Sequence, residues 1–146
     1  MLTKHPLDAA ELFTHRGLRC TRQRRVLLDA LAATKAHPTA DQLYRSVVER
    51  CPGMSLATVY NTLEAFCRVG LAQKLPGAEG IAHYDANVQS HLHLVVENTG
   101  AVEDVAEPVS AAILNQILPE LARDVEARLS FKIRQVNVEI IGTYPK

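Results

Sequence analysis

The chain has 146 residues, of which 47% are apolar and 22% charged, and its formal net charge is zero. This apolar content supports folded cores and excludes a wholly disordered protein. No run approaches the roughly 18 apolar residues of a membrane-spanning helix, and the N-terminus lacks the apolar core of a signal peptide. We therefore expect a cytoplasmic protein without membrane contact.

Charge is unevenly divided along the chain. Residues 1–80 carry 11 Lys+Arg and 7 Asp+Glu, whereas residues 81–146 carry 5 and 9. A basic front half indicates contact with nucleic acid and leaves a different task for the acidic back half. The three cysteines, Cys20, Cys51 and Cys67, form no Cys-x-x-Cys motif, which suits a reducing compartment.

The front half begins with two predicted helices. Pro6 and Gly17 bracket a first helix over about 7–16, because proline favours the first turn and glycine the residue after the end. Thr21 is placed to cap a second helix. Three arginines crowd the first turn of this second helix, where the macrodipole disfavours cations. That placement is easier to understand if a phosphate lies nearby.

Two further helices have the pattern of a helix-turn-helix motif. Thr39-Ala-Asp-Gln42 matches a capping box, so a third helix begins there and reaches about Arg50. Ser55 is placed to cap a fourth helix that reaches Val69 and is closed by Gly70. The apolar stripe of the fourth helix is Leu56, Val59, Leu63 and Phe66, and the residues expected on its outer side are Thr58, Asn61, Thr62 and Ala65, with Tyr60 on the flank. Short uncharged side chains on the second helix are typical of a recognition helix.

A hairpin is predicted directly after the fourth helix. Residues 71–75 and 81–85 flank the glycine-containing turn Pro76-Gly77-Ala78-Glu79-Gly80. A hairpin in this position supplies the wing of a winged-helix domain.

A group of side chains able to bind a metal lies between residues 82 and 104. His91 and His93 stand two residues apart in a run predicted as a strand over 91–96, so both imidazoles point the same way. A lone His-x-His pair is also common on protein surfaces, so the motif by itself is a hypothesis. The remaining donors are Asp85, Asp104 and, from a loop much earlier in the chain, His37. This mixture of nitrogen and oxygen donors suits a divalent transition metal.

The back half predicts a small sheet with one helix. Residues 102–105 are expected to pair with the preceding strand, Pro119 to begin a helix that reaches about Leu129, and residues 131–141 to form a last strand with a bulge near 134–135. The surplus of Ile, Leu and Val in so short a region indicates a dimer interface.

The stretch Ser55-Leu-Ala-Thr-Val-Tyr-Asn-Thr-Leu63 resembles the recognition helix of the ferric uptake regulator (Fur) family of metal-dependent repressors. Thr21–Arg24, His37–Tyr44 and His83–Asp104 resemble three further stretches of the family, in the same order. The resemblance implies an α+β fold in which residues 1–85 form a winged-helix DNA-binding domain. Residues 86–90 then form a hinge, and residues 91–146 form a small α/β domain for dimerisation and metal sensing.

The same resemblance implies a homodimeric repressor that binds palindromic double-stranded DNA when one metal ion bridges its domains. Fe(II) or Mn(II) is the expected ion, and Zn(II) is able to occupy the same site. The implied ligands are His37, Asp85, His91, His93 and Asp104. We expect DNA contacts from Tyr60, Asn61, Thr58 and Ser55 on or beside the recognition helix, and from Arg16, Arg19, Arg22, Arg24 and Lys74.

One departure from the family is plain in the sequence. The family usually carries a structural zinc bound by two Cys-x-x-Cys pairs, one of them in the turn after the His-x-His strand. Here that turn reads Val96-Glu-Asn-Thr-Gly100, and the C-terminal end, Gly142-Thr-Tyr-Pro-Lys146, also lacks cysteine. We therefore expect no structural zinc bound by four cysteines, as in the zinc-less branch that includes some peroxide-responsive repressors and the iron-response regulators.

Aspartate at both carboxylate positions favours peroxide as the signal. By resemblance, peroxide-responsive members carry Asp at the position of Asp104 where plain iron sensors usually carry Glu, and the oxidised ligands are His37 and His91. Glu103 is a rival for the role of Asp104.

Three alternatives to peroxide sensing remain. The first is an iron- or manganese-responsive regulator without peroxide sensing. The second is a haem-responsive regulator that uses Cys51-Pro52. The third is a metalloenzyme, which is disfavoured because five protein ligands leave little room for the open coordination position that catalysis needs.

Overall fold

The structure is a computed structural model that describes residues 9–88, 91–133 and 136–146. The chain divides into two compact units. Unit 1 comprises residues 1–76 and 81–88, and unit 2 comprises residues 77–80 and 89–146. Within the described ranges, no helix is both long enough and apolar enough to span a membrane.

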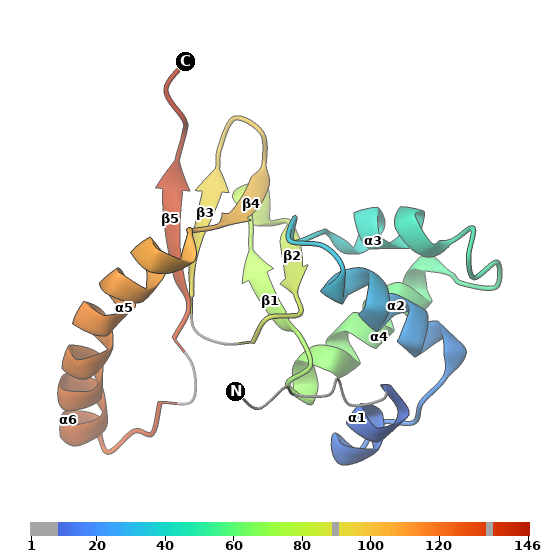
Figure 1. The fold of residues 1–146 in the computed structure, drawn as a ribbon, viewed down its shortest axis with the longest axis horizontal. Helices are drawn as coiled ribbons and strands as arrows, with labels where there is room; N and C mark the ends of the chain where they lie inside the picture. Colours follow the sequence, from blue (N-terminus) through green and yellow to red (C-terminus); the bar gives the residue numbers. More distant parts are fainter. Residues whose placement is uncertain (1–8, 89–90, 134–135) are drawn as a thin grey trace. The chain divides into compact units, whose positions relative to one another are not determined.

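Unit 1 combines helices with a two-stranded antiparallel sheet (Figure 1). Its elements are α1 (Ala9–His15), α2 (Arg22–Ala32), α3 (Ala40–Val47), α4 (Leu56–Arg68), β1 (Gln73–Pro76) and β2 (Ala82–Asp85). The strands pair from Gln73 opposite Asp85 to Pro76 opposite Ala82, which forms the predicted wing. This arrangement confirms the winged-helix fold.

The helix ends follow from local chemistry. The Thr39 hydroxyl accepts from Gln42 N at 3.2 Å, and the Gln42 side chain accepts from Thr39 N at 2.9 Å, which confirms the capping box. Thr21 and Ser55 cap α2 and α4 through their hydroxyls. Gly17 ends α1 with a φ of 73°, while the predicted start of this helix at Pro6 lies outside the described residues.

The core of unit 1 lies between α1, α2, α3 and α4. Its fully buried members include Phe13, Leu27, Leu31, Leu43, Val47, Val59, Leu63 and Phe66. Thr62 and Ala65 are also buried, at 6% and 4% exposure, so their predicted place on the outer side of α4 is wrong. The reason is that α4 contacts α2, α3 and β1, which together cover a wider arc of the helix than one apolar stripe.

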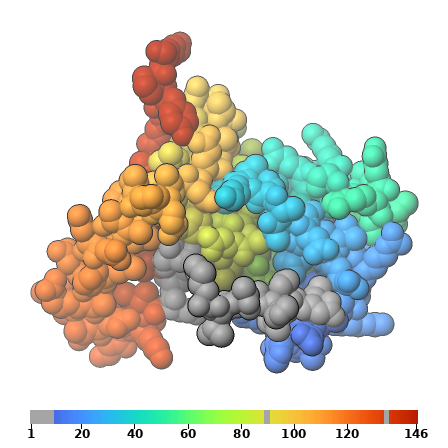
Figure 2. Space-filling view, viewed as in Figure 1, coloured from blue at the N-terminus to red at the C-terminus, as the bar shows by residue number. Residues whose placement is uncertain are grey.

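Unit 2 is built on a mixed three-stranded sheet with β3 in the centre (Figure 1). Its strands are β3 (Leu92–Val96), β4 (Ala101–Asp104) and β5 (Val138–Gly142), and its helical segments are η1 (Ala78–Gly80), α5 (Glu107–Leu121), the π-helical turn η2 (Ala122–Glu126) and α6 (Ala127–Leu129). Strand β4 runs antiparallel to β3, and β5 runs parallel to it. Figure 2 shows α5, η2 and α6 in orange, exposed along the surface of this unit.

Two predictions for the back half are corrected. The helix begins at Glu107, with Pro108 in its first turn, so Pro119 lies inside α5 and does not begin a helix. A proline without an N–H weakens the backbone ladder there, and the π-helical turn η2 follows at Ala122. The last strand spans only Val138–Gly142, and the predicted bulge at 134–135 lies outside the described residues.

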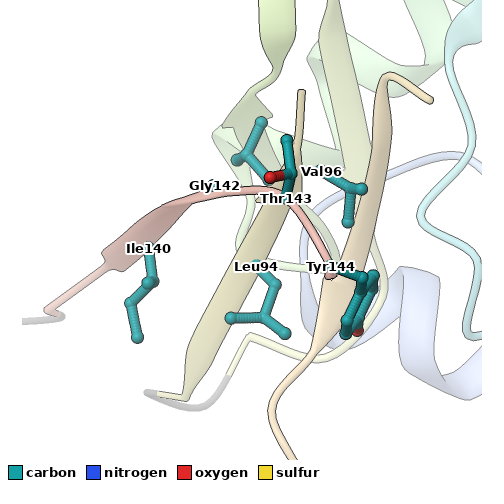
Figure 3. A pocket seen from close by; sticks show the side chains of 7 residues that line it. Leu94, Val96, Ile140, Gly142, Thr143 and Tyr144 are labelled. Carbon is teal, nitrogen blue, oxygen red and sulfur yellow. The ribbon is translucent and has the colours of Figure 1, made fainter. Parts of the chain in front are cut away.

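One face of the unit 2 sheet carries an apolar cavity of about 210 Å³. Figure 3 shows Leu94 between Ile140 and Tyr144 on this face. The Tyr144 hydroxyl donates to the Glu103 carboxylate at 2.6 Å, and Glu97 N donates to the Gly142 carbonyl at 2.9 Å. These bonds fasten the C-terminal end of the described chain to β4 and to the turn after β3.

We expect Gly17→Ala to lower the free energy of unfolding by about 1 kcal/mol, because a side chain at positive φ is strained even though open space surrounds the residue. Gly53→Ala is the matched control: no positive φ applies there, and its free energy of unfolding should stay equal or rise by less than about 1 kcal/mol. Urea unfolding followed by circular dichroism checks both, and equal losses would contradict this account of the α1 end.

Candidate metal centre and nucleic-acid face

In unit 1, a buried imidazole and a buried carboxylate stand side by side. His37 lies in the loop before α3 and is 2% exposed, and Asp85 ends β2. Nδ1 of His37 is 3.7 Å from Oδ1 of Asp85, and the same oxygen accepts from Asn87 N at 2.9 Å. The fold of this unit thus brings together two donor groups that lie far apart in the sequence.

In unit 2, two imidazoles share one carboxylate. The rings of His91 and His93 have centroids 4.2 Å apart and are tilted by 57°. Oδ1 of Asp104 is 3.0 Å from Nε2 of His91 and 3.5 Å from Nε2 of His93. The antiparallel register, in which His93 stands opposite Asp104, causes this convergence.

The register also decides between the two acidic residues at the end of β4. Successive side chains of a strand point to opposite faces, so Glu103 and Asp104 cannot both face the imidazoles. Glu103 stands opposite Leu94 and accepts the Tyr144 hydrogen bond on the far face. Asp104 is therefore the carboxylate of this histidine pair.

The donor atoms fit a divalent transition metal. Imidazole nitrogen and carboxylate oxygen are ligands for zinc, iron and manganese, at about 2.0–2.2 Å from a zinc ion. Two such ligands that are neighbours around one ion stand about 3 Å apart, close to the 3.0 and 3.5 Å found around Asp104. Each unit therefore contains donor groups that suit a divalent metal.

Comparison with known proteins places this sequence and fold. Residues 15–140 match the model of the ferric uptake regulator family. The chain belongs to the ferric uptake regulator family. This confirms the resemblance stated from the four sequence stretches, together with the α+β fold class.

Individual relatives of this Fur-family chain carry regulatory names. It is 34% identical to the peroxide operon regulator of Bacillus subtilis over 135 residues, which are 92% of this chain and 88% of that protein. The peroxide stress regulator of Campylobacter jejuni matches with a TM-score of 0.69 and 25% identity, over 96% of this chain and 98% of that one. The ferric uptake regulator of Pseudomonas aeruginosa with manganese matches with a TM-score of 0.73 and 25% identity, over 93% and 97%.

The outer side of α4 in this Fur-family chain borders a polar hollow. Tyr60 is 43% exposed and Asn61 is exposed, as a base-reading role needs. A hollow of about 410 Å³ is lined by Arg19, Thr21, Gln23, Arg24, Thr58, Asn61 and Thr62. The fold thus places Arg19, from the segment before α2, and Arg24, from the first turn of α2, beside α4, although both lie far from α4 in sequence.

Several side chains that are predicted to contact DNA form hydrogen bonds or ion pairs within the protein. Arg16 donates to the Val69 carbonyl at 3.1 Å, Arg22 to the Arg50 carbonyl at 3.2 Å and Arg24 to the Arg19 carbonyl at 2.8 Å. Lys74 forms an ion pair with Glu64 at 3.2 Å, and the Ser55 hydroxyl lies 2.8 Å from that of Thr58. Since a guanidinium has five N–H donors, these bonds orient the arginines and leave donors for phosphate.

Sequence reasoning missed His83. This buried residue of β2 stands two positions before Asp85, so both side chains point to the same face of the strand. Its Nδ1 lies 2.6 Å from the carbonyl oxygen of His37. The spacing of two residues between His83 and Asp85 is the sequence feature that indicates His83 lies on the same face of the strand as a candidate ligand.

We expect Asp104→Asn to weaken Mn(II) binding at least about tenfold, since it removes the carboxylate that both imidazoles share. Glu103→Gln, the adjacent control on the other face, should bind Mn(II) as the unaltered protein does. Titration with detection of free Mn(II) by electron paramagnetic resonance measures both. If Glu103→Gln lost Mn(II) binding and Asp104→Asn retained it, Glu103 and not Asp104 would be the carboxylate that binds the metal.

Proposed function

We propose that the chain is a homodimeric, metal-dependent transcriptional repressor that releases its DNA when peroxide oxidises histidines at its metal centre. The observation that carries the proposal is the pair of imidazole–carboxylate groups, His37 with Asp85 and His91 and His93 with Asp104. The names of the Bacillus subtilis and Campylobacter jejuni proteins support peroxide as the signal.

One divalent ion bound by all five residues would join the two units of the chain. A ligand shifts a conformational equilibrium only if it binds one state better than the other. An ion held from both units favours the arrangement in which both sets of ligands meet, and this arrangement is the one that binds DNA. Loss of a single ligand weakens that preference and lowers DNA affinity.

Fe(II) or Mn(II) is the proposed ion, and Zn(II) competes for the same donors. Fe(II), held by these five residues, would supply the one-electron reduction that breaks the O–O bond of peroxide. Overall, one peroxide oxygen would pass to an imidazole and the other would leave as water, so peroxide is the two-electron oxidant. His37 and His91 are the proposed targets of oxidation. Addition of one oxygen to an imidazole lowers its capacity to bind metal, which converts the chemical event into release of DNA.

The cysteines give little support to a thiol or haem sensor. Burial raises the pKa of Cys67 to about 11, so its reactive thiolate is scarce at neutral pH. Cys51 is 6% exposed and packs in the core of unit 1, so a haem iron could reach its sulfur only if this core opened. These observations favour sensing at the metal.

Unit 2 has the surface expected of a dimer interface. Large apolar side chains exposed there are Val109, Leu129, Phe131, Ile140, Ile141 and Tyr144. Large exposed apolar side chains are more often found where another protein binds, and a two-fold dimer suits a helix-turn-helix protein that reads palindromic DNA. The dimer is proposed to form without a structural zinc bound by four cysteines, because the chain has only three cysteines and all of them lie in unit 1.

A plain manganese- or iron-responsive repressor is the second candidate. The similarity to the Pseudomonas aeruginosa ferric uptake regulator with manganese supports it. Both candidates use the same ligands, and they differ only in whether peroxide modifies them.

Peroxide treatment of Fe(II)-loaded and Mn(II)-loaded protein separates the two candidates. We expect peptide mass spectrometry to find one added oxygen at His37 or His91 with Fe(II) alone, together with loss of operator binding. The Mn(II)-loaded sample is the matched control, because Mn(II) is a much weaker reductant than Fe(II) and does not cleave peroxide. Unmodified histidines and unchanged DNA binding with Fe(II) would leave the plain metal-responsive repressor.

Substitutions at the predicted DNA-contacting residues should impair DNA binding in two different ways. Asn61→Ala should relax sequence preference, because one base contact contributes about 1–3 kcal/mol of discrimination. Arg19→Ala should weaken binding to all DNA sequences alike and reduce the salt dependence of binding by about one ion. Binding to operator and scrambled duplexes at several salt concentrations measures both, with Arg128→Ala in unit 2 as the control that changes neither. Loss of specificity in Arg19→Ala alone would contradict this docking.

A further inference from the structure

The imidazole of His83 is buried beside the proposed metal ligands of unit 1 without belonging to them. It is 6% exposed, and its Nδ1 lies 2.6 Å from the carbonyl oxygen of His37. A carbonyl oxygen only accepts, so Nδ1 of His83 carries the proton and donates it. The bond joins β2, in the wing, to a loop residue 46 positions earlier.

His37 needs such a partner because of its backbone. Its φ is 49°, a region that residues other than glycine seldom occupy. Backbone in sparsely populated regions persists where the surroundings hold it, often at ligand sites. Two consecutive residues of β2 do so here: His83 binds the carbonyl of His37, and Tyr84 N donates to the carbonyl of Pro38 at 2.9 Å.

The same strand also carries the second unit 1 donor. Asp85 follows His83 by two residues, so its carboxylate points to the same face of β2. Strand β2 therefore carries Asp85 itself and holds His37 through the hydrogen bond from His83. Nδ1 of His37 and Oδ1 of Asp85 are 3.7 Å apart.

We propose that His83 is a positioning residue of the metal centre, whose Nδ1–H holds the His37 backbone so that the His37 ring faces the ion together with Asp85. This inference rests on the proposed function, since it assigns His37 as a ligand. Residues that orient metal ligands commonly change metal affinity 10–100-fold when they are replaced. A role in packing alone would affect stability and leave affinity unchanged.

Three substitutions at His83 separate the hydrogen bond from the packing. His83→Asn places an amide N–H near the position of Nδ1, His83→Gln places it farther out, and His83→Leu removes it while filling much of the space. Mn(II) affinity of the full-length protein is measured by electron paramagnetic resonance of free Mn(II), and thermal unfolding is recorded without metal. His37→Ala is measured in parallel.

We expect His83→Asn to bind Mn(II) within about threefold of the unaltered protein, and His83→Leu and His83→Gln to bind about 10–100-fold more weakly. Hydrogen exchange of the Tyr84 amide without metal should be faster in the two weak variants, because the His37–Pro38 loop is then released. If His83→Leu does not fold, the Asn and Gln pair decides the question.

Unchanged affinity in His83→Gln and His83→Leu, with weak binding in His37→Ala, would overturn the positioning role while leaving the proposed function intact. Equal weakness of His83→Asn and His83→Gln would also overturn it, since the donor position would then be irrelevant. Unchanged affinity in His37→Ala would refute the ligand set itself and the positioning role with it.

Discussion

The alternation of side chains along extended strands is the constraint on which both groups of candidate metal ligands depend. It sends His91 and His93 to one face of the unit 2 sheet and separates Asp104 from Glu103 across β4. In unit 1 it aligns His83 with Asp85 on β2. A slip of one residue in either register would turn the groups on the slipped strand to the wrong face.

These aligned groups are also buried, which favours the binding of a cation beside them. His37, Asp85, His91 and His93 are each at most 6% exposed, and a buried carboxylate is costly unless a cation or hydrogen-bond donors accompany it. Asp85 has Asn87 N as one donor, and a divalent ion would supply further compensation. Metal binding at such groups is therefore coupled to the structure of the segments that carry them.

The sequence predicted the features that depend on neighbouring residues. The caps at Thr21, Thr39 and Ser55 are local hydrogen bonds, and the His-x-His spacing is local as well. The burial of Thr62, the place of Pro119 within α5 and the bond from His83 to His37 depend on segments distant in the sequence. Short-range patterns carry no information about which distant carbonyl or helix face a side chain meets.

We propose that ligands from both units bind one ion. Electron spin echo envelope modulation of Mn(II)-loaded protein, with ¹⁵N-labelled histidine as the reference, counts the imidazole nitrogens on the ion. We expect three imidazoles in the unaltered protein and two in His37→Ala, with the ion still bound by His91 and His93. A count of two in both proteins would contradict it, because the ion would then be held by unit 2 alone.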